Sequence, residues 1–175
     1  MTNKFLKDYF TIESLGDGIV GVGVPNSAVS MKYRVNNGEW VETSEAIQLN
    51  VSANDKVQIS CVCSEFEDMS LFNVSVPFKV CGNIMSLLFG DDFEGKTDLT
   101  ESSYVEPFRY LFSGCTTLTD ASNLILPATK LTTSCYYGMF QGCTSLTTAP
   151  ELPATTLASQ CYSNMFSNCT SLTVA

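Results

Sequence analysis

The sequence predicts a mainly β protein in two parts, an N-terminal β-sandwich over residues 1–80 and a C-terminal stack of repeats over residues 104–175. Two observations support this prediction. Apolar and polar residues alternate through the N-terminal part, and closely similar segments follow one another in the C-terminal part. Residues 81–103, between the two parts, are predicted to form a linker and a degenerate capping coil.

Alternation with a period of two places one set of side chains inward and the other in water, which is typical of antiparallel strands with one covered face. The alternating apolar positions are Met31, Tyr33 and Val35; Ile47, Leu49 and Val51; Val57, Ile59, Cys61 and Cys63; and Phe72, Val74, Val76, Phe78 and Val80. About six or seven short strands in this length predict a β-sandwich with Ig-like connectivity.

A hairpin turn is predicted at Asn36, Asn37 and Gly38, between Tyr33 and Trp40. Asn and Gly tolerate the positive φ that tight hairpin turns require. Tyr33 and Trp40 could form a stacking platform for a sugar, although a hairpin more commonly packs its aromatic residues into the core.

The C-terminal half contains segments that align without gaps at residues 108–121, 136–149 and 162–175. An aromatic residue, Leu or Met, Phe, Cys, Leu and Ala recur at fixed positions, while the residues between them change. One such coil cannot bury its apolar face alone, but stacked coils bury a continuous core. The alignment therefore predicts two side-chain columns: Phe112, Phe140 and Phe166, and Leu118, Leu146 and Leu172.

The string Met-Phe-x-x-Cys-Thr-Ser-Leu-Thr-x-Ala-Pro-x-Leu-Pro-Ala-Thr-Thr-Leu, complete at residues 139–157, resembles the BspA-type leucine-rich repeats. Such repeats occur in surface proteins of anaerobic bacteria and in tail or fibre proteins of their phages. The resemblance covers residues 84–175 and implies a leucine-rich-repeat solenoid with short strands and short helical turns. It implies adhesion or recognition as the function. Because the last coil lacks a cap, we expect the repeats to be truncated at residue 175 or to continue beyond it.

Charge and composition exclude several classes of function. The chain has a net charge of −9 and no positive charge after Lys130, so it offers no basic surface for nucleic acid. It contains no His, which excludes Ser-His-Asp and Cys-His catalysis, and we predict no enzyme and no cofactor. No apolar run of about 18 residues predicts membrane insertion, and no signal peptide is evident.

The cysteines of the repeats are predicted to form inward-facing ladders of free thiols. Cys115, Cys143 and Cys169 share one repeat position, and Cys135 and Cys161 share another. Free Cys behaves as a small buried apolar residue. Stacked coils about 4.8 Å apart would also permit a disulfide.

Two further motifs have structural explanations. Residues 16–21 match the glycine pattern of dinucleotide-binding loops, but an alternating strand follows them where that motif requires a helix. Asp91, Asp92, Glu94 and Asp98 could offer oxygen ligands to calcium, but their spacing is not that of an EF-hand loop. We interpret them as a solvated acidic linker and predict no metal site.

The candidate ligand-binding residues are outward-facing positions of the repeats. Strands are expected at residues 118–121, 146–149 and 172–175, and a second variable set is expected on the short helical side. The candidates are Thr119, Asp120, Thr147, Thr148, Thr173, Val174, Arg109 and Tyr137. Threonine also suits strands because it is β-branched, which is the purely structural explanation.

The sequence thus predicts a non-enzymatic recognition or adhesion protein, with a phage virion component favoured. The N-terminal part would contact a virion or envelope protein, the repeats would bind a host-surface protein or glycan, and a homo-oligomer is possible. The location would be extracellular, on a virion surface or on a bacterial cell surface if a leader is missing. A bacterial BspA-like surface adhesin and a purely structural spacer are the alternatives.

Overall fold

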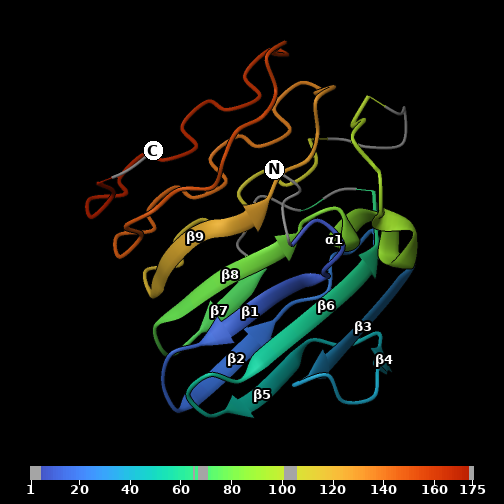
Figure 1. Ribbon diagram of the computed structural model, residues 1–175, viewed down its shortest axis with the longest axis vertical. Helices are drawn as coiled ribbons and strands as arrows, with labels where there is room; N and C mark the ends of the chain where they lie inside the picture. Colours follow the sequence, from blue (N-terminus) through green and yellow to red (C-terminus); the bar gives the residue numbers. More distant parts are fainter. Residues whose placement is uncertain (1–4, 65, 67–70, 101–105, 174–175) are drawn as a thin grey trace.

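The computed structural model describes residues 5–64, 66, 71–100 and 106–173, and within them the protein is mainly β (Figure 1). Its elements in chain order are β1 (Phe10–Ser14), β2 (Gly18–Val22), β3 (Ser30–Val35), β4 (Val41–Thr43), β5 (Ile47–Val51), β6 (Lys56–Val62), β7 (Phe72–Val74), β8 (Phe78–Asn83), α1 (Ser86–Phe89), the 3-10 helix η1 (Gly90–Phe93) and β9 (Leu118–Ile125).

The strands form two open sheets. The larger sheet has the order β4-β3-β6-β1-β8-β9, and the smaller has the order β5-β2-β7. Neighbouring strands are antiparallel except β8 and β9, which are parallel. The predicted alternation is confirmed on β6, where the apolar residues Val57, Ile59 and Cys61 are buried. Phe10 of β1 and Val20 of β2 bring both sheets into the same core.

The predicted Ig-like connectivity is wrong. In an immunoglobulin constant domain the first two strands are neighbours in one sheet, whereas here β1 lies between β6 and β8 and β2 lies in the other sheet. Glycines allow the chain to cross from the larger sheet to the smaller one between β1 and β2. A Cβ at Gly18 would lie 2.4 Å from Cγ1 of Val76, so only glycine fits at the start of β2. The glycine-rich segment therefore leads into a strand, as predicted.

The predicted hairpin turn is confirmed. Asn36 and Asn37 have φ values of 51° and 59°, and the N–H of Gly38 donates to the carbonyl of Val35 at 2.9 Å. This turn joins β3 to β4 at the edge of the larger sheet.

The predicted leucine-rich-repeat solenoid with short strands and short helical turns is wrong. Among the described residues from 106 to 173, β9 is the only regular strand, it belongs to the larger sheet, and no helix is present. The backbone explains why. A left-handed φ recurs at positions four residues apart, which interrupts any α-helical turn. These positions include Tyr110 and Gly114; Ser134, Gly138 and Gly142; and Gln160, Asn164 and Asn168.

The repeat segments instead form layers of turns, and Figure 1 shows residues 136–173 in orange to red on the side of β9 away from β8. We call residues 108–121, 136–149 and 162–173 the first, second and third layer. Within a layer, alternate N–H groups donate to the carbonyl three residues earlier, as Met139 does to Tyr136. The N–H groups between them donate to the next layer, as Phe140 does to Met165 at 2.9 Å, whereas the N–H of Thr147 donates back to the carbonyl of Thr119 in the first layer at 2.9 Å.

Aromatic rings run through the layers and into the N-terminal sheets. The Phe112 and Phe140 rings lie 5.2 Å apart, and Phe140 and Phe166 lie 5.5 Å apart, so the predicted phenylalanine column is present. Phe72 of β7 continues it at 5.2 Å from Phe112, and Phe10 of β1 contacts Phe72 at 5.3 Å. The repeats therefore share one hydrophobic core with the sheets.

A second column contains a buried hydroxyl. Phe108 stacks on Tyr136 at 5.6 Å, and Tyr136 stacks on Tyr162 at 5.6 Å. Tyr136 is fully buried, and its hydroxyl has no hydrogen-bond partner in the described part of the chain. Burial also raises the pKa of Tyr136 well above its ordinary value. The first layer places Phe at the same position, so the column does not require this hydroxyl.

Removing the Tyr136 hydroxyl tests whether this buried group is unsatisfied. Tyr136→Phe is expected to stabilise the protein by about 1 kcal/mol, because it removes an unsatisfied buried polar group without changing the ring. Urea unfolding would measure the change. Tyr137→Phe is the matched control and should not stabilise, because the Tyr137 hydroxyl accepts a hydrogen bond from Asn164 at 2.8 Å. A loss of stability in Tyr136→Phe would contradict the assignment.

Candidate recognition surfaces

The predicted threonine row is present, and its hydroxyl protons are used inside the fold. Oγ1 of Thr119 donates to the carbonyl of Phe78 at 2.9 Å, and Oγ1 of Thr147 donates to the carbonyl of Thr119 at 2.9 Å. Thr173 donates in the same way to Thr147 at 3.3 Å. The row therefore joins successive layers, and it leaves only oxygen lone pairs and methyl groups for a ligand.

The neighbouring predicted positions also pair between layers. Asp120 and Thr148 form an isolated parallel bridge, which is all that remains of the strand expected in the second layer. Oδ1 of Asp120 accepts a hydrogen bond from the N–H of Ser122 at 2.8 Å. Val174 lies outside the described residues. The structure thus brings the threonines and Asp120 onto one side of the layers.

The other predicted pair, Arg109 and Tyr137, lies in a compact cluster. The Arg109 guanidinium lies 5.2 Å from the centre of the Tyr110 ring and 5.3 Å from that of Tyr137. The two rings meet edge to face at 5.5 Å, and Asn164 donates to the Tyr137 hydroxyl. Glu106 pairs with the guanidinium. We call Arg109, Tyr110, Tyr137 and Asn164 the arginine–tyrosine cluster, and it joins all three layers.

The sequence prediction missed Tyr110 and Asn164, although a signal was present. They occupy one repeat position, which Gly138 fills in the second layer, and this position varies as much as the one before it. Gly138 is needed because a Cβ there would lie 2.3 Å from Cε1 of Tyr110. The small residue in one layer makes room for the large ring of the layer before it.

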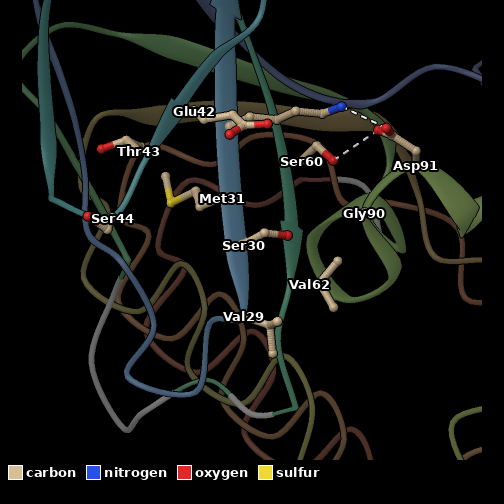
Figure 2. A pocket seen from close by; sticks show the side chains of 11 residues that line it. Val29, Ser30, Met31, Glu42, Thr43, Ser44, Ser60, Val62, Gly90 and Asp91 are labelled. Carbon is tan, nitrogen blue, oxygen red and sulfur yellow. Dashed lines mark hydrogen bonds and ion pairs between the residues drawn. The ribbon is translucent and has the colours of Figure 1, made fainter.

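The N-terminal half carries a separate groove of about 550 Å³ beside β3 and β4. Figure 2 shows hydroxyl and apolar side chains around it, with Asp91 at one end. Its lining residues are Val29, Ser30, Met31, Lys32, Glu42, Thr43, Ser44, Ser60, Val62, Gly90 and Asp91.

Asp91 is the centre of a polar network in this groove. Its carboxylate accepts hydrogen bonds from Lys32 at 2.7 Å, from the Tyr9 hydroxyl at 2.9 Å and from Ser60 at 3.5 Å (Figure 2 labels Asp91 and Ser60). The hydrogen bond from Lys32 is the main reason why the pKa of Asp91 lies below its ordinary value. Burial, followed by the bond to Asp91, raises the pKa of Tyr9.

Trp40, the candidate stacking residue, is already in contact with side chains of the larger sheet and with Tyr9. Nζ of Lys32 and Cζ of Arg34 lie 4.8 Å and 4.7 Å from the centre of its ring. Tyr9 meets the ring edge to face at 4.8 Å. Trp40 therefore lies in a cation–π cluster outside the core.

The acidic residues 91–98 do not converge on one point. Asp91 pairs with Lys32, Glu94 with Lys7 at 3.3 Å and Asp98 with Lys130 at 2.8 Å. The described residues contain no cluster of His, Cys, Asp or Glu that could hold a metal ion.

The cysteines of the repeats lie between the layers, and none of the described cysteines forms a disulfide. The thiol of Cys143 donates to the carbonyl of Phe112 at 3.1 Å, and that of Cys169 donates to Phe140 at 3.0 Å. Burial raises the pKa of Cys135 to about 12. These thiols connect layers and are poor nucleophiles.

Comparisons of the chain with protein-family models, with curated proteins and with solved structures find no match. None of the described helices is long and apolar enough to span a membrane.

The Asp91 network makes stability depend on pH. Because the folded pKa of Asp91 is lowered, its contribution is present above the unfolded value of about 3.9 and is lost as pH falls through the folded pKa. Asp91→Asn should therefore destabilise the protein at pH 7 but much less at pH 3. The difference should stay below about 1 kcal/mol because the side chain is largely exposed.

Urea unfolding at both pH values measures this difference. Asp92→Asn removes the same charge from the adjacent exposed residue and serves as the control. An equal loss for both variants, or a loss for Asp91→Asn that does not depend on pH, would show that the network contributes nothing specific.

Proposed function

We propose that the protein is a non-enzymatic recognition protein whose arginine–tyrosine cluster binds a protein or glycan on a host surface. One observation carries the proposal. Two adjacent variable positions of the repeats are Arg-Tyr, Tyr-Gly and Ser-Asn in the successive layers, and four of these residues, Arg109, Tyr110, Tyr137 and Asn164, contact one another in one cluster. Variation that gathers on one surface favours binding over a spacer.

The chemistry of the cluster suits such a ligand. Arg and Tyr are the residue types that most often dominate binding energy in protein interfaces. The Arg109 guanidinium is held by Glu106 and by two rings, so little side-chain freedom remains to be lost on binding. The absence of positive charge after Lys130 argues against nucleic acid as the ligand.

The N-terminal half is the proposed attachment part. Its groove beside β3 offers a concave, hydroxyl-rich surface with Val29, a residue that is 83% exposed, at its wall. We assign contact with a virion or envelope protein to this half. The motif resemblance favours a virion tail or fibre component over a bacterial surface adhesin, and both place the protein outside the cell.

A structural spacer is the second candidate. It is supported by the threonine row, whose hydroxyl protons are used between layers. In that case the variable cluster would have no ligand.

Substitutions in the cluster distinguish the two candidates. Arg109→Ala and Tyr137→Ala should each weaken binding of the labelled protein to intact anaerobic gut bacteria by roughly tenfold or more, as loss of an interface hot spot does. Arg109→Lys keeps the charge but loses the planar stacking, so it should also weaken binding. Thr144→Ala, at an exposed position that is Thr in every layer, is the control.

Thermal unfolding of each variant verifies that it remains folded. Binding by Arg109→Ala and Tyr137→Ala that equals binding by the unchanged protein would favour the spacer. A pull-down of the full chain with purified tail components and with solubilised envelope separates the two locations. Retention of a tail protein supports a virion part, whereas retention of envelope material alone supports an adhesin.

A further inference from the structure

The side of the sandwich formed by β4 and β5 is open. Within the described part of the chain, each of these strands ends its sheet and pairs with one neighbour only. The opposite edges are covered by the repeats, since the N–H of Leu71 beside β7 donates to the carbonyl of Leu111 at 3.3 Å and that of Ala121 in β9 donates to Thr148 at 3.0 Å. Figure 1 shows β4 and β5 at the end of the sheets away from the repeats. An open edge strand is a template for another strand.

The unpaired backbone groups of β5 belong to Gln48 and Asn50. Along a strand, successive residues turn their N–H and C=O groups to opposite sides. The carbonyl of Ile19 in β2 accepts a hydrogen bond at 2.9 Å on the β7 side, so the next residue, Val20, faces β5. Leu49 lies opposite Val20 and therefore bonds to β2. The backbone groups of Gln48 and Asn50 consequently point away from the sheet.

The apolar side chains at this open side face inward but are not covered. Tyr33 lies opposite both Val41 and the fully buried Ile59, so all three side chains share the inner face of the larger sheet. Leu49 lies opposite the fully buried Val20 on the inner face of the smaller sheet. Nevertheless Val41 is 46% exposed, and Tyr33 and Leu49 are only partly buried. A strand added beside β5 would cover these side chains.

The segment that links β3 to β5 along this side is acidic. Glu39, Glu42 and Glu45 are exposed, and residues 39–45 contain no Lys or Arg. Lys32 lies opposite Glu42 in the sheet but pairs with Asp91 instead. A second copy joined edge to edge would bring two such acidic segments together, which is unfavourable, whereas a basic segment would be attracted.

We propose that the open edge of β5 binds an extended basic segment of a partner protein as an added strand. The segment alternates apolar residues with Lys or Arg. Its backbone bonds to Gln48 and Asn50, its apolar side chains cover Leu49 and Val41, and its cations lie near Glu42 and its acidic neighbours. The proposal deepens the attachment role proposed for the N-terminal half, and it rests on that role.

Amide hydrogen exchange of the full chain tests the added strand, with a short synthetic peptide of alternating Lys and Val as the probe. The peptide should slow exchange at Gln48 and Asn50 by roughly tenfold or more, because their N–H groups gain acceptors. Exchange at Leu49, which already bonds to β2, should change little and is the internal control. The same peptide with Glu in place of Lys should give no protection.

Variants of the chain test the role of the acidic segment. Glu42→Gln and Glu45→Gln should each weaken binding of the Lys-Val peptide several-fold, because each removes a charge that attracts the cations. Glu151→Gln removes the same charge from an exposed position in the repeat half and should leave binding unchanged. Equal binding by all three variants and the unchanged chain would contradict the proposed charge complementarity.

The exchange experiment also separates the possible occupants of the edge. No protection of Gln48 and Asn50, or equal protection by the Glu-Val peptide, would overturn the proposal. Protection in the unmixed chain that rises with protein concentration would identify a second copy as the occupant and would also overturn it.

The pull-down with tail and envelope components tests the attachment role separately. Retention of a partner without protection by the Lys-Val peptide would overturn the strand addition and move attachment to another surface. Protection by the peptide without any retained partner would support the strand-binding edge and count against the attachment role.

Discussion

The recurring left-handed residue in each layer is the constraint on which the repeat half depends. It turns successive peptide groups so that alternate N–H groups point along the stack, where the next layer supplies carbonyls. Several of these positions are not glycine, including Tyr110, Ser134 and Gln160, and a left-handed backbone there costs on the order of 1 kcal/mol each. Bonds between layers and the stacked rings offset that cost, so a single layer would not be expected to hold this conformation alone.

The first layer must meet a complementary surface, and the N-terminal sheets provide it. β8 pairs in parallel with β9, and Phe72 places its ring on that of Phe112. The thiol of Cys115 donates to the carbonyl of Phe72 at 3.6 Å, which is the same contact that later layers make with one another. The β7 region thus acts toward the first layer as a preceding layer would, and the direction of the whole stack follows from it.

Sequence patterns predicted the features that depend on local chemistry. Alternation identified the strands, Asn36 and Asn37 identified the hairpin turn, and the aligned phenylalanines identified the column of rings. Strand order was not predictable, because β1 pairs with β6 and β8 through contacts far apart in sequence. The conformation of the repeats was missed because Ser134 and Gln160 carry no sequence signal for a positive φ.

Only part of the candidate surface was predicted, because the rest depends on contacts between layers. Arg109 and Tyr137 stood out by their variation, but the packing of Tyr110 over Gly138 depends on how adjacent layers align in space. The inward hydrogen bonds of the threonines were also hidden, since a threonine on a strand has the same appearance in sequence whether its hydroxyl faces solvent or a neighbouring carbonyl.

The central claim is that one core joins the sheets to the repeats, and equilibrium unfolding tests it most directly. Fluorescence of Trp40, the single tryptophan, reports on the larger sheet, and the reactivity of the Cys143 thiol reports on the second layer. The account predicts that both signals change in one coincident transition with urea. Exposure of Cys143 at a clearly lower urea concentration than the change at Trp40 would contradict a shared core.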